Sequence, residues 1–440
     1  MTFKTLSTAA LSGVMLAGMA GVALAQDAAP AVSPETAYIF NTLLFLVGGF
    51  LVMWMAAGFA MLEAGLVRSK NVSMQCLKNI GLYSVAGIMY WIVGYNLMYT
   101  GVDGGYFGSF GPYSFDPVGG NALDTGYSTA SDWFFQMVFV ATAASIVSGT
   151  LAERIKLLPF MIFTVILTGF IYPIAGSWKW GAGWLDAMGF QDFAGSTLVH
   201  SVGGWCALTG ALILGARKGK YVDGKVQPMP GSSIPLATLG TFILWLGWFG
   251  FNGASQLAMG TINDVSDVSR IFANTNLAAA GGVVAVMILM PLIYGKVDVT
   301  MVLNGALAGL VSITAEPLNP SPFLSIVIGA VGGIIVVFAV PAIDKLKIDD
   351  VVGAIPVHLL AGIWGTFIVP LSNADASYGV QIIGILAYGV FTVVVSAVIW
   401  LILKAVMGIR VSAEEEAIGL DKAEVGVEAY PEFTAAGTRF

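Results

Sequence analysis

Eleven stretches of mainly apolar residues follow one another along the chain, and each is near the roughly 20 residues that a helix needs to cross a bilayer. They cover residues 38–62, 78–100, 132–151, 157–177, 196–216, 234–254, 271–293, 299–316, 321–342, 355–371 and 379–404. The chain is 57% hydrophobic and only 10% charged, whereas a typical soluble domain carries about 25% charged residues. We therefore predict an all-α polytopic membrane protein with eleven transmembrane helices.

The same composition excludes several classes of function. So few charges exclude a soluble enzyme and a disordered protein, and a net charge of −7 disfavours a nucleic-acid partner. The two cysteines, Cys76 and Cys206, lie inside apolar stretches and lack the spacing of a disulfide framework or a metal site. We expect a membrane protein that needs neither metal nor cofactor.

Residues 1–25 have the pattern of a cleaved secretory signal peptide. Lys4 precedes an apolar run over residues 9–24, and Ala23-Leu24-Ala25 provides a small-residue cleavage site. The alternative is an uncleaved first helix. The remaining chain divides into a transmembrane domain over residues 26–409 and a polar tail over residues 410–440.

The positive charges of the loops predict an orientation. If the mature N-terminus lies outside and eleven spans alternate, the inside loops and the tail hold 16 of the 19 Lys and Arg residues, including Lys78. The outside loops hold only Lys179 and Arg270. Because positive residues accumulate in cytoplasmic loops, we predict a protein of the inner (plasma) membrane with a periplasmic N-terminus and a cytoplasmic C-terminus.

The only two histidines of the sequence, His200 and His358, lie in a repeated motif. Each ends the pattern D-x-x-G-x-x-x-V-H, which begins at Asp192 and at Asp350, and a glycine follows each histidine four residues later. The copies fall in the fifth and tenth spans, so the two helices enter the membrane from opposite faces. This predicts a 5+5 inverted repeat, with halves at about 38–216 and 234–371, plus one C-terminal helix.

The spacing within the motif predicts how deep both imidazoles lie. Eight helical residues rise about 12 Å, so an aspartate at each membrane surface places its histidine near mid-membrane. Ionisable groups inside a membrane usually mark a pathway, and we interpret His200 and His358 as pore residues; the alternative is a pair of structural histidines. Asp192 and Asp350 begin their helices, where a carboxylate caps free N–H groups, and Asp192 can also favour a cation outside.

The stretch from Asp192 through Val199-His200 and Gly203-Gly204 to Arg217 resembles the signature of bacterial ammonium transporters, in the ammonium transporter, methylammonium permease and Rhesus family. The resemblance covers essentially the whole mature chain. Further matching stretches are residues 134–136, 151–154, 247–252 and 304–310, and Asp349-Asp350 before His358. The family implies eleven spans and a homotrimer with one histidine-lined pore in each subunit.

Carried over residue by residue, the resemblance implies an outer binding site of Phe139, Trp180, Phe251 and Ser255. Phe139 and Phe251 would also form a stacked gate, His200 and His358 the pore, and Asp192 the structural acid. Many members of the family carry another aspartate where this chain has Gly353, so the chain departs from the pattern near the inner gate.

The polar tail supports two interpretations. By composition it is a mobile cytoplasmic extension. Residues 408–411 and 419–421, however, resemble the family tail, which docks on neighbouring subunits and on a PII-type signalling protein.

The chemistry of the site residues agrees with ammonium, or its analogue methylammonium, as the substrate. Aromatic faces attract a small cation, whereas an apolar pore penalises an intact cation far more than neutral ammonia. We therefore predict a transporter, not an enzyme, that captures NH4+, removes its proton and conducts ammonia past neutral imidazoles. The alternatives are an ammonium sensor with little flux and a haem-b redox protein with the two histidines as axial ligands.

Overall fold

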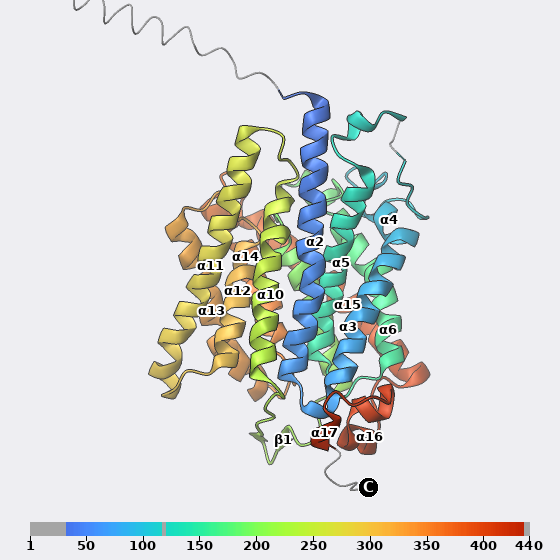
Figure 1. Ribbon diagram of the computed structural model, residues 1–440, viewed down its shortest axis with the longest axis vertical. Helices are drawn as coiled ribbons and strands as arrows, with labels where there is room; N and C mark the ends of the chain where they lie inside the picture. Colours follow the sequence, from blue (N-terminus) through green and yellow to red (C-terminus); the bar gives the residue numbers. More distant parts are fainter. Residues whose placement is uncertain (1–31, 117–119, 435–440) are drawn as a thin grey trace, which may run out of the picture.

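The structure is a computed structural model that describes residues 32–116 and 120–434. In these ranges the chain forms a bundle of long helices with one short β-hairpin at one end (Figure 1). The predicted signal peptide, residues 1–25, lies outside the described residues and stays a prediction.

Nine helical segments of the described chain are long and apolar enough to cross a membrane. In the first half they are built from α2 (Pro34–Leu66), η1 (Ser69–Asn71) with α3 (Val72–Met89), η2 (Tyr90–Gly94) and α4 (Tyr95–Tyr99), η4 (Ala122–Thr125) with α5 (Thr129–Thr150), α6 (Leu157–Ile166) with η5 (Leu167–Ile171) and α7 (Tyr172–Ser177), and η6 (Ser196–Ser201) with α9 (Val202–Leu214). In the second half they are α10 (Ile234–Gly253) with η7 (Ala254–Gln256), α11 (Ile262–Tyr294), α13 (Pro322–Lys345) and α15 (Tyr378–Met407).

Two shorter apolar helices complete the bundle. They are α12 (Val299–Ile313) and the segment formed by η8 (Ile355–Leu360), α14 (Ala361–Phe367) and η9 (Val369–Leu371). The remaining elements are α8 (Trp184–Ala187), the hairpin of β1 (Tyr221–Val222) and β2 (Lys225–Val226), α16 (Ala413–Ile418), η10 (Asp421–Val425) and α17 (Pro431–Thr434). The eleven predicted stretches all overlap helices, but a count of eleven spans and the inverted repeat stay predictions.

The start of α11 differs from the sequence-based expectation. This helix begins at Ile262, well before the predicted boundary at residue 271. Thr261 and Asp264 form a capping box, in which the Thr261 hydroxyl accepts from the Asp264 N–H at 3.2 Å and the Asp264 carboxylate accepts from the Thr261 N–H at 2.9 Å. The first turns of α11 are therefore polar and continue the helix beyond its apolar stretch.

Small residues bring α2 and α10 close together, and the two helices run side by side in Figure 1. A Cβ added at Gly58 of α2 would lie only 3.1 Å from the carbonyl oxygen of Gly240 on α10, and one added at Gly250 would lie 2.7 Å from that of Gly48. In lipid, where burial of apolar surface drives little association, such close backbone packing holds helices together. These two helices begin the two predicted repeat halves.

An ion-paired group joins the loops at one end of the bundle. We call this end, which carries α16 and α17, the tail face, and the group of Arg68, Glu153, Arg217 and Asp349 the loop clamp. The guanidinium of Arg217 donates to both carboxylate oxygens of Asp349 at 2.9 Å and lies 3.4 Å from Glu153, which also pairs with Arg68. These residues follow four different helices, α2, α5, α9 and α13, so the clamp fixes the ends of all four.

The charges of the clamp also shift the ionisation of its acids. Burial by itself raises the pKa of the Asp349 carboxyl, but the hydrogen bonds and charge of Arg217 and the charge of Arg154 outweigh it. The net effect holds the pKa of Asp349 well below its ordinary value. The pKa of Glu153 is likewise lowered, because Arg217 and Arg68 outweigh its burial.

The tail is packed against the tail face up to the last described residues, so its composition-based interpretation as a mobile extension is wrong for this part. The Asp421 carboxylate accepts from the N–H of Met74, in the first turn of α3, at 2.9 Å. The Lys70 ammonium donates to the carbonyl oxygens of Glu416 and Ala417 at 2.9 and 2.6 Å. These partners of the tail, Lys70 and Met74, lie 346–347 residues away in sequence, and composition gives no sign of them.

The prediction that Lys78 lies in an inside loop is also wrong. Lys78 is on α3, is fully buried, and donates from its ammonium group to the carbonyl oxygen of Ser148 at 2.9 Å. A lysine can be buried there because a second ionisable residue, Glu63 near the end of α2, is buried beside it.

We predict that Asp349→Asn lowers the free energy of unfolding by about 3–5 kcal/mol, because Arg217 then keeps a buried charge without a full partner. Thermal unfolding of the purified protein measures this loss. The matched control is Asp344→Asn, which leaves the partly exposed Lys220 without its acidic partner and should change stability by less than about 1 kcal/mol.

The stability difference should also depend on pH. Because the folded-state pKa of Asp349 is lowered, the contribution of its carboxylate to stability is present above about pH 4 and is lost as the pH falls further. The difference in unfolding free energy between parent and Asp349→Asn should therefore become smaller in acid. Equal losses in the two variants would contradict the prediction.

Candidate functional site

The structure brings the two histidines together in the interior of the bundle. His200 lies on η6 and His358 on η8, two π-helical turns that pack against each other. The two Nδ1 atoms are 3.2 Å apart, the rings are nearly parallel at a centroid distance of 5.2 Å, and both side chains are buried. At this distance one Nδ1 donates a hydrogen to the other, so one ring carries a hydrogen on Nδ1 and the other does not.

This geometry does not suit a haem iron. Two axial histidines lie on opposite sides of the metal, which separates their nitrogens by about 4 Å if each metal–nitrogen bond is about 2 Å. His200 and His358 instead contact each other directly at 3.2 Å, with no space for a porphyrin between them. The residues therefore do not fit the redox alternative.

The glycine that follows each histidine explains how the two turns come so close. A Cβ added at Gly204 would lie 2.7 Å from the Cβ of Leu359, beside His358. A Cβ added at Gly362 would lie 2.7 Å from the hydroxyl oxygen of Ser201, beside His200. Each copy of the motif thus supplies a glycine that receives the other copy, and any larger side chain would separate the imidazoles.

The two motif aspartates cap the helices that carry the histidines. The Asp192 carboxylate accepts four backbone N–H groups at 2.8–3.1 Å, those of Gly195, Ser196, Thr197 and Leu198. Asp350 accepts from the N–H groups of Gly353 and Ile355 and from the hydroxyl of Thr150. Burial raises the pKa of Asp192 to about 6, and the four donors keep it from rising further. The geometry agrees with the interpretation that both residues are caps.

The glycine of each motif has a backbone conformation that favours glycine. Gly195 has φ +103° and Gly353 has φ +78°. A Cβ at Gly353 would lie 2.5 Å from the side-chain nitrogen of Asn304, which donates to the carbonyl oxygen of Val352. An aspartate here would both adopt a backbone conformation that favours glycine and require Asn304 to move, so these two features fit the glycine at the position where the chain departs from the family pattern.

An open cavity of about 340 Å³ lies at the opposite end of the bundle from the tail face, and we call it the vestibule. Phe139, Trp180 and Ser255 of the predicted outer site line it, whereas Phe251 does not. The Trp180 indole donates to the carbonyl oxygen of Asp192 at 3.0 Å. The Ser255 hydroxyl donates to the carbonyl oxygen of Phe251 at 2.7 Å, which leaves the serine oxygen able to accept a hydrogen bond.

The rings of the predicted gate residues lie against each other beneath the vestibule, tilted by 33°. The rings of Phe139 and Phe251 have centroids 4.1 Å apart, and both are essentially fully buried. Phe251 in turn lies 5.3 Å from the ring of His200. Phe139, Phe251, His200 and His358 therefore form a continuous file of rings, which we call the ring file.

Several residues of the site were not predicted from the sequence. Trp248 stacks on His200 at 5.0 Å, and Phe135 meets Phe139 edge-on at 4.9 Å. The vestibule is also lined by Phe45, Tyr95, Tyr99, Tyr127, Asp132, Gln136, Phe193 and Leu257. Helical spacing could have found some of them, since Phe135 precedes Phe139 by one turn and Trp248 precedes Phe251 by one turn.

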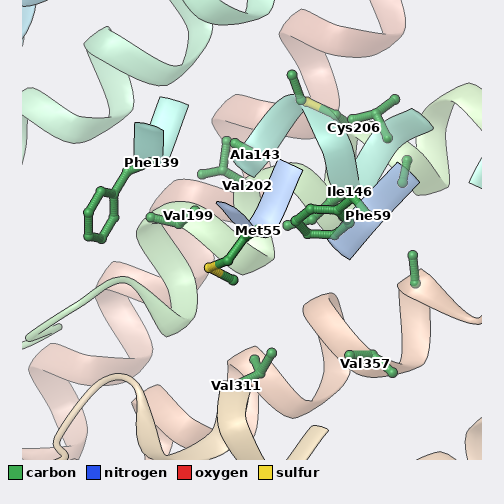
Figure 2. Packing of buried hydrophobic residues seen from close by; sticks show 14 of the residues in the cluster. Met55, Phe59, Phe139, Ala143, Ile146, Val199, Val202, Cys206, Val311 and Val357 are labelled. Carbon is green, nitrogen blue, oxygen red and sulfur yellow. The ribbon is translucent and has the colours of Figure 1, made fainter. Parts of the chain in front are cut away.

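A second, smaller cavity begins where the ring file ends. His358 lines it together with Phe59, Glu63, Ser145 and Asn304, on the side of the tail face. Figure 2 shows the apolar side chains around this route, with Phe139 on one side of the group, Phe59 and Ile146 on the other, and Met55 and Val199 between them. The ring file thus separates two cavities within an apolar wall.

The sequence profile described as the Ammonium Transporter Family matches residues 43–430, nearly the whole described chain. The chain belongs to this family. Ammonium transporter Amt2 of Archaeoglobus fulgidus is 43% identical over 426 residues, which cover 89% of this chain and 88% of that protein. A putative ammonium transporter of Synechocystis is 40% identical over 423 residues, 94% of each chain.

Solved structures of this family have the same fold. A structure titled Sensor Amt Protein superposes with a TM-score of 0.84 at 35% identity, over 89% of this chain and all of that one. Mep2 of Candida albicans superposes with a TM-score of 0.77 at 27% identity, over 87% and 88% of the two chains.

We predict that Asp192→Asn destabilises the protein more than Asp350→Asn does. The amide nitrogen of asparagine would face N–H groups that it cannot accept, and each buried N–H left without an acceptor costs about 1–3 kcal/mol. Asp192 serves four such groups and Asp350 two. Thermal unfolding midpoints of the two variants test this, and an equal or larger loss for Asp350→Asn would count against it.

Proposed function

We propose that this protein transports ammonium across the inner membrane by conducting ammonia. NH4+ binds in the vestibule, loses its proton near the gate, and crosses the ring file as NH3 past the two histidines. The observation that carries this proposal is the ring file itself, which joins the vestibule to the cavity below His358 through buried aromatic and imidazole rings.

The vestibule has the chemistry to select ammonium. The faces of Phe139 and Trp180 attract a cation, by about 0.5–1 kcal/mol each when exposed and more when water is excluded. Ser255 supplies an acceptor for one of the four N–H groups, and the buried Asp132 adds negative charge to the wall. Potassium has no N–H group to donate and no proton to lose, so the same route rejects it.

The gate favours the neutral species. Phe139 and Phe251 place two apolar rings across the path, and an intact cation would lose hydration there that these rings do not replace. Ammonia loses far less, and the neutral imidazoles of His200 and His358 can exchange hydrogen bonds with it on the other side. Their direct contact keeps both rings in place for this role.

The arrangement in the membrane follows from the same proposal. We assign eleven spans in a 5+5 inverted repeat plus a last helix, a periplasmic vestibule, a cytoplasmic tail face and a transmembrane domain over residues 26–409 after signal-peptide cleavage. The many exposed apolar side chains along α2, α10, α11 and α15 support contact with lipid or with neighbouring subunits of a homotrimer. The tail covers residues 410–440, and its described part, up to residue 434, forms part of the surface on which a PII-type signalling protein would bind.

We predict that His200→Ala combined with His358→Ala abolishes selective, deprotonation-linked transport while the protein still folds. Currents on a supported membrane during ammonium and potassium pulses measure this, together with the thermal unfolding midpoint. Undiminished ammonium flux with potassium still excluded would refute the role of the histidines.

We predict that Phe251→Ala opens the gate or weakens capture, because it removes the ring between Phe139 and His200. The affinity for methylammonium and the exclusion of potassium should both change. The matched control is Phe249→Ala on the same helix, since Phe249 stacks on Phe272 and has no place in the ring file. Kinetics of Phe251→Ala identical to those of the parent would remove it from the site.

An ammonium sensor is the second candidate. It is favoured by the similarity to the structure titled Sensor Amt Protein and by the tail packed on the tail face. Uptake of methylammonium into proteoliposomes separates the two functions, because a pure sensor would show no pore-dependent flux.

A further inference from the structure

A buried acid and a buried base lie beside the path, and neither is part of the proposed transport route described so far. Glu63 lies one turn before the end of α2, and Lys78 lies on α3; their exposed fractions are 1% and 0%. Ionisable residues are costly inside a membrane and usually serve a proton or ion pathway. A purely structural ion pair is the other explanation, and the hydrogen bonds of Glu63 distinguish between them.

The Glu63 carboxylate is only half satisfied by protein groups. Its Oε2 accepts from the Gln75 side-chain amide at 2.6 Å and from the Ser148 hydroxyl at 2.8 Å. Its Oε1 is buried and has no hydrogen-bond partner among the described residues. Lys78 does not fill this position, because its ammonium group donates to the carbonyl oxygen of Ser148 instead. In a purely structural ion pair, the Lys78 ammonium would donate to the Glu63 carboxylate, which is the strongest acceptor nearby. Because Oε1 is left without a donor, it is free to bind another partner.

Other buried polar atoms around Glu63 also have unused hydrogen-bonding capacity. The amide oxygens of Gln75 and Asn79 are also buried without a partner in the described chain, and the Lys78 ammonium has three donors but one acceptor. Buried polar groups of this kind normally bind internal water. Three elements, α2, α3 and α5, contribute side chains or backbone to this group, so it is a built polar site within an apolar bundle.

The site opens toward the histidines. Glu63 and His358 line the same small cavity, in which about 10 Å³ is free to the centre of a water molecule, close to the room that one buried water needs. The polar side chains of Ser145 and Asn304 and the ring of Phe59 also line this cavity. A single water there can bond to an imidazole on one side and to a carboxylate on the other.

We propose that Glu63 is the proton acceptor on the tail-face side of the pore, reached from His358 through one water. This inference rests on the proposed function. The proton lost by NH4+ passes through the histidine pair and makes His358 an imidazolium. His358 then gives a proton to the cavity water as that water gives one to Oε1 of Glu63, which leaves a neutral imidazole and a carboxylic acid. The proton leaves Glu63 for the tail face, where ammonia takes one up again.

Lys78 is a positioning residue in this scheme. It keeps a positive charge near Glu63, and the attraction between the two opposes the effect of burial, which disfavours an ionised carboxylate. Arg154, in the loop after α5, is a further cation whose charge acts on Lys78. Gln75 and Ser148 fix Oε2, so that Oε1 remains the atom available to the cavity.

The test measures charge and substrate separately in the same proteoliposomes. Currents evoked by ammonium pulses report proton movement, methylammonium uptake reports substrate, and the thermal unfolding midpoint reports folding. Glu63→Gln should reduce the current at least tenfold and the uptake less than threefold, and Glu63→Asp should recover part of the current. The matched control is Glu316→Gln, a buried carboxylate held by Asn373 outside the ring file, which should leave the current unchanged.

A double variant, Glu63→Gln with Lys78→Met, excludes a purely structural role. It removes both charges and therefore leaves no unpaired one, so a structural pair predicts that the current returns. The proposal expects the current to stay lost, because no acid is left to take the proton.

The other outcomes decide the two proposals separately. Parental current in Glu63→Gln, or recovery in the double variant, would overturn this inference alone. A parent that moves methylammonium without current would also overturn it, and a parent without any substrate flux would instead overturn the proposed function.

Discussion

The contact between the imidazoles of His200 and His358 is the interaction that the surrounding structure serves. Both rings are buried in an apolar bundle, where a hydrogen-bonding group without a partner costs several kcal/mol in lipid-like surroundings. The two Nδ1 atoms satisfy each other, and this requires two turns from distant parts of the chain to meet within van der Waals distance. Gly204 and Gly362 permit that approach, and Asp192 and Asp350 hold the ends of the two helices.

The need of a buried polar group for a partner also explains where buried charge is tolerated. Asp192 is buried, and four N–H donors surround its carboxylate. The acids of the loop clamp are buried against arginines. Glu63 has one carboxylate oxygen without a partner among the described residues, and Glu63 lines a cavity shared with His358. Asp421 also has such an oxygen, but it lies in the tail, away from the pore, so the shared cavity is what marks Glu63 for a functional role.

Much of the candidate site could be predicted, because its residues belong to local sequence patterns. The repeated motif led to both histidines and both caps, and the family resemblance led to Phe139, Phe251, Trp180 and Ser255. Residues without a pattern of their own were missed. Tyr95 and Tyr127 line the vestibule from different parts of the chain. Asn304 limits the space at Gly353 only because α12 passes beside that glycine. The tail was interpreted as mobile from its composition, although Asp421 finds its partner at the start of α3.

The sequence alone determined that this chain is a membrane protein and where its helices lie approximately. It also determined that the two histidines occupy equivalent positions in a repeated motif. These features depend on the hydrophobicity and spacing of neighbouring residues, which any chain displays before it folds. Tertiary structure alone decided which side chains share a cavity, which oxygens find donors and which remain free. Those outcomes depend on distances between residues far apart in sequence, and only the packing of helices against one another sets such distances.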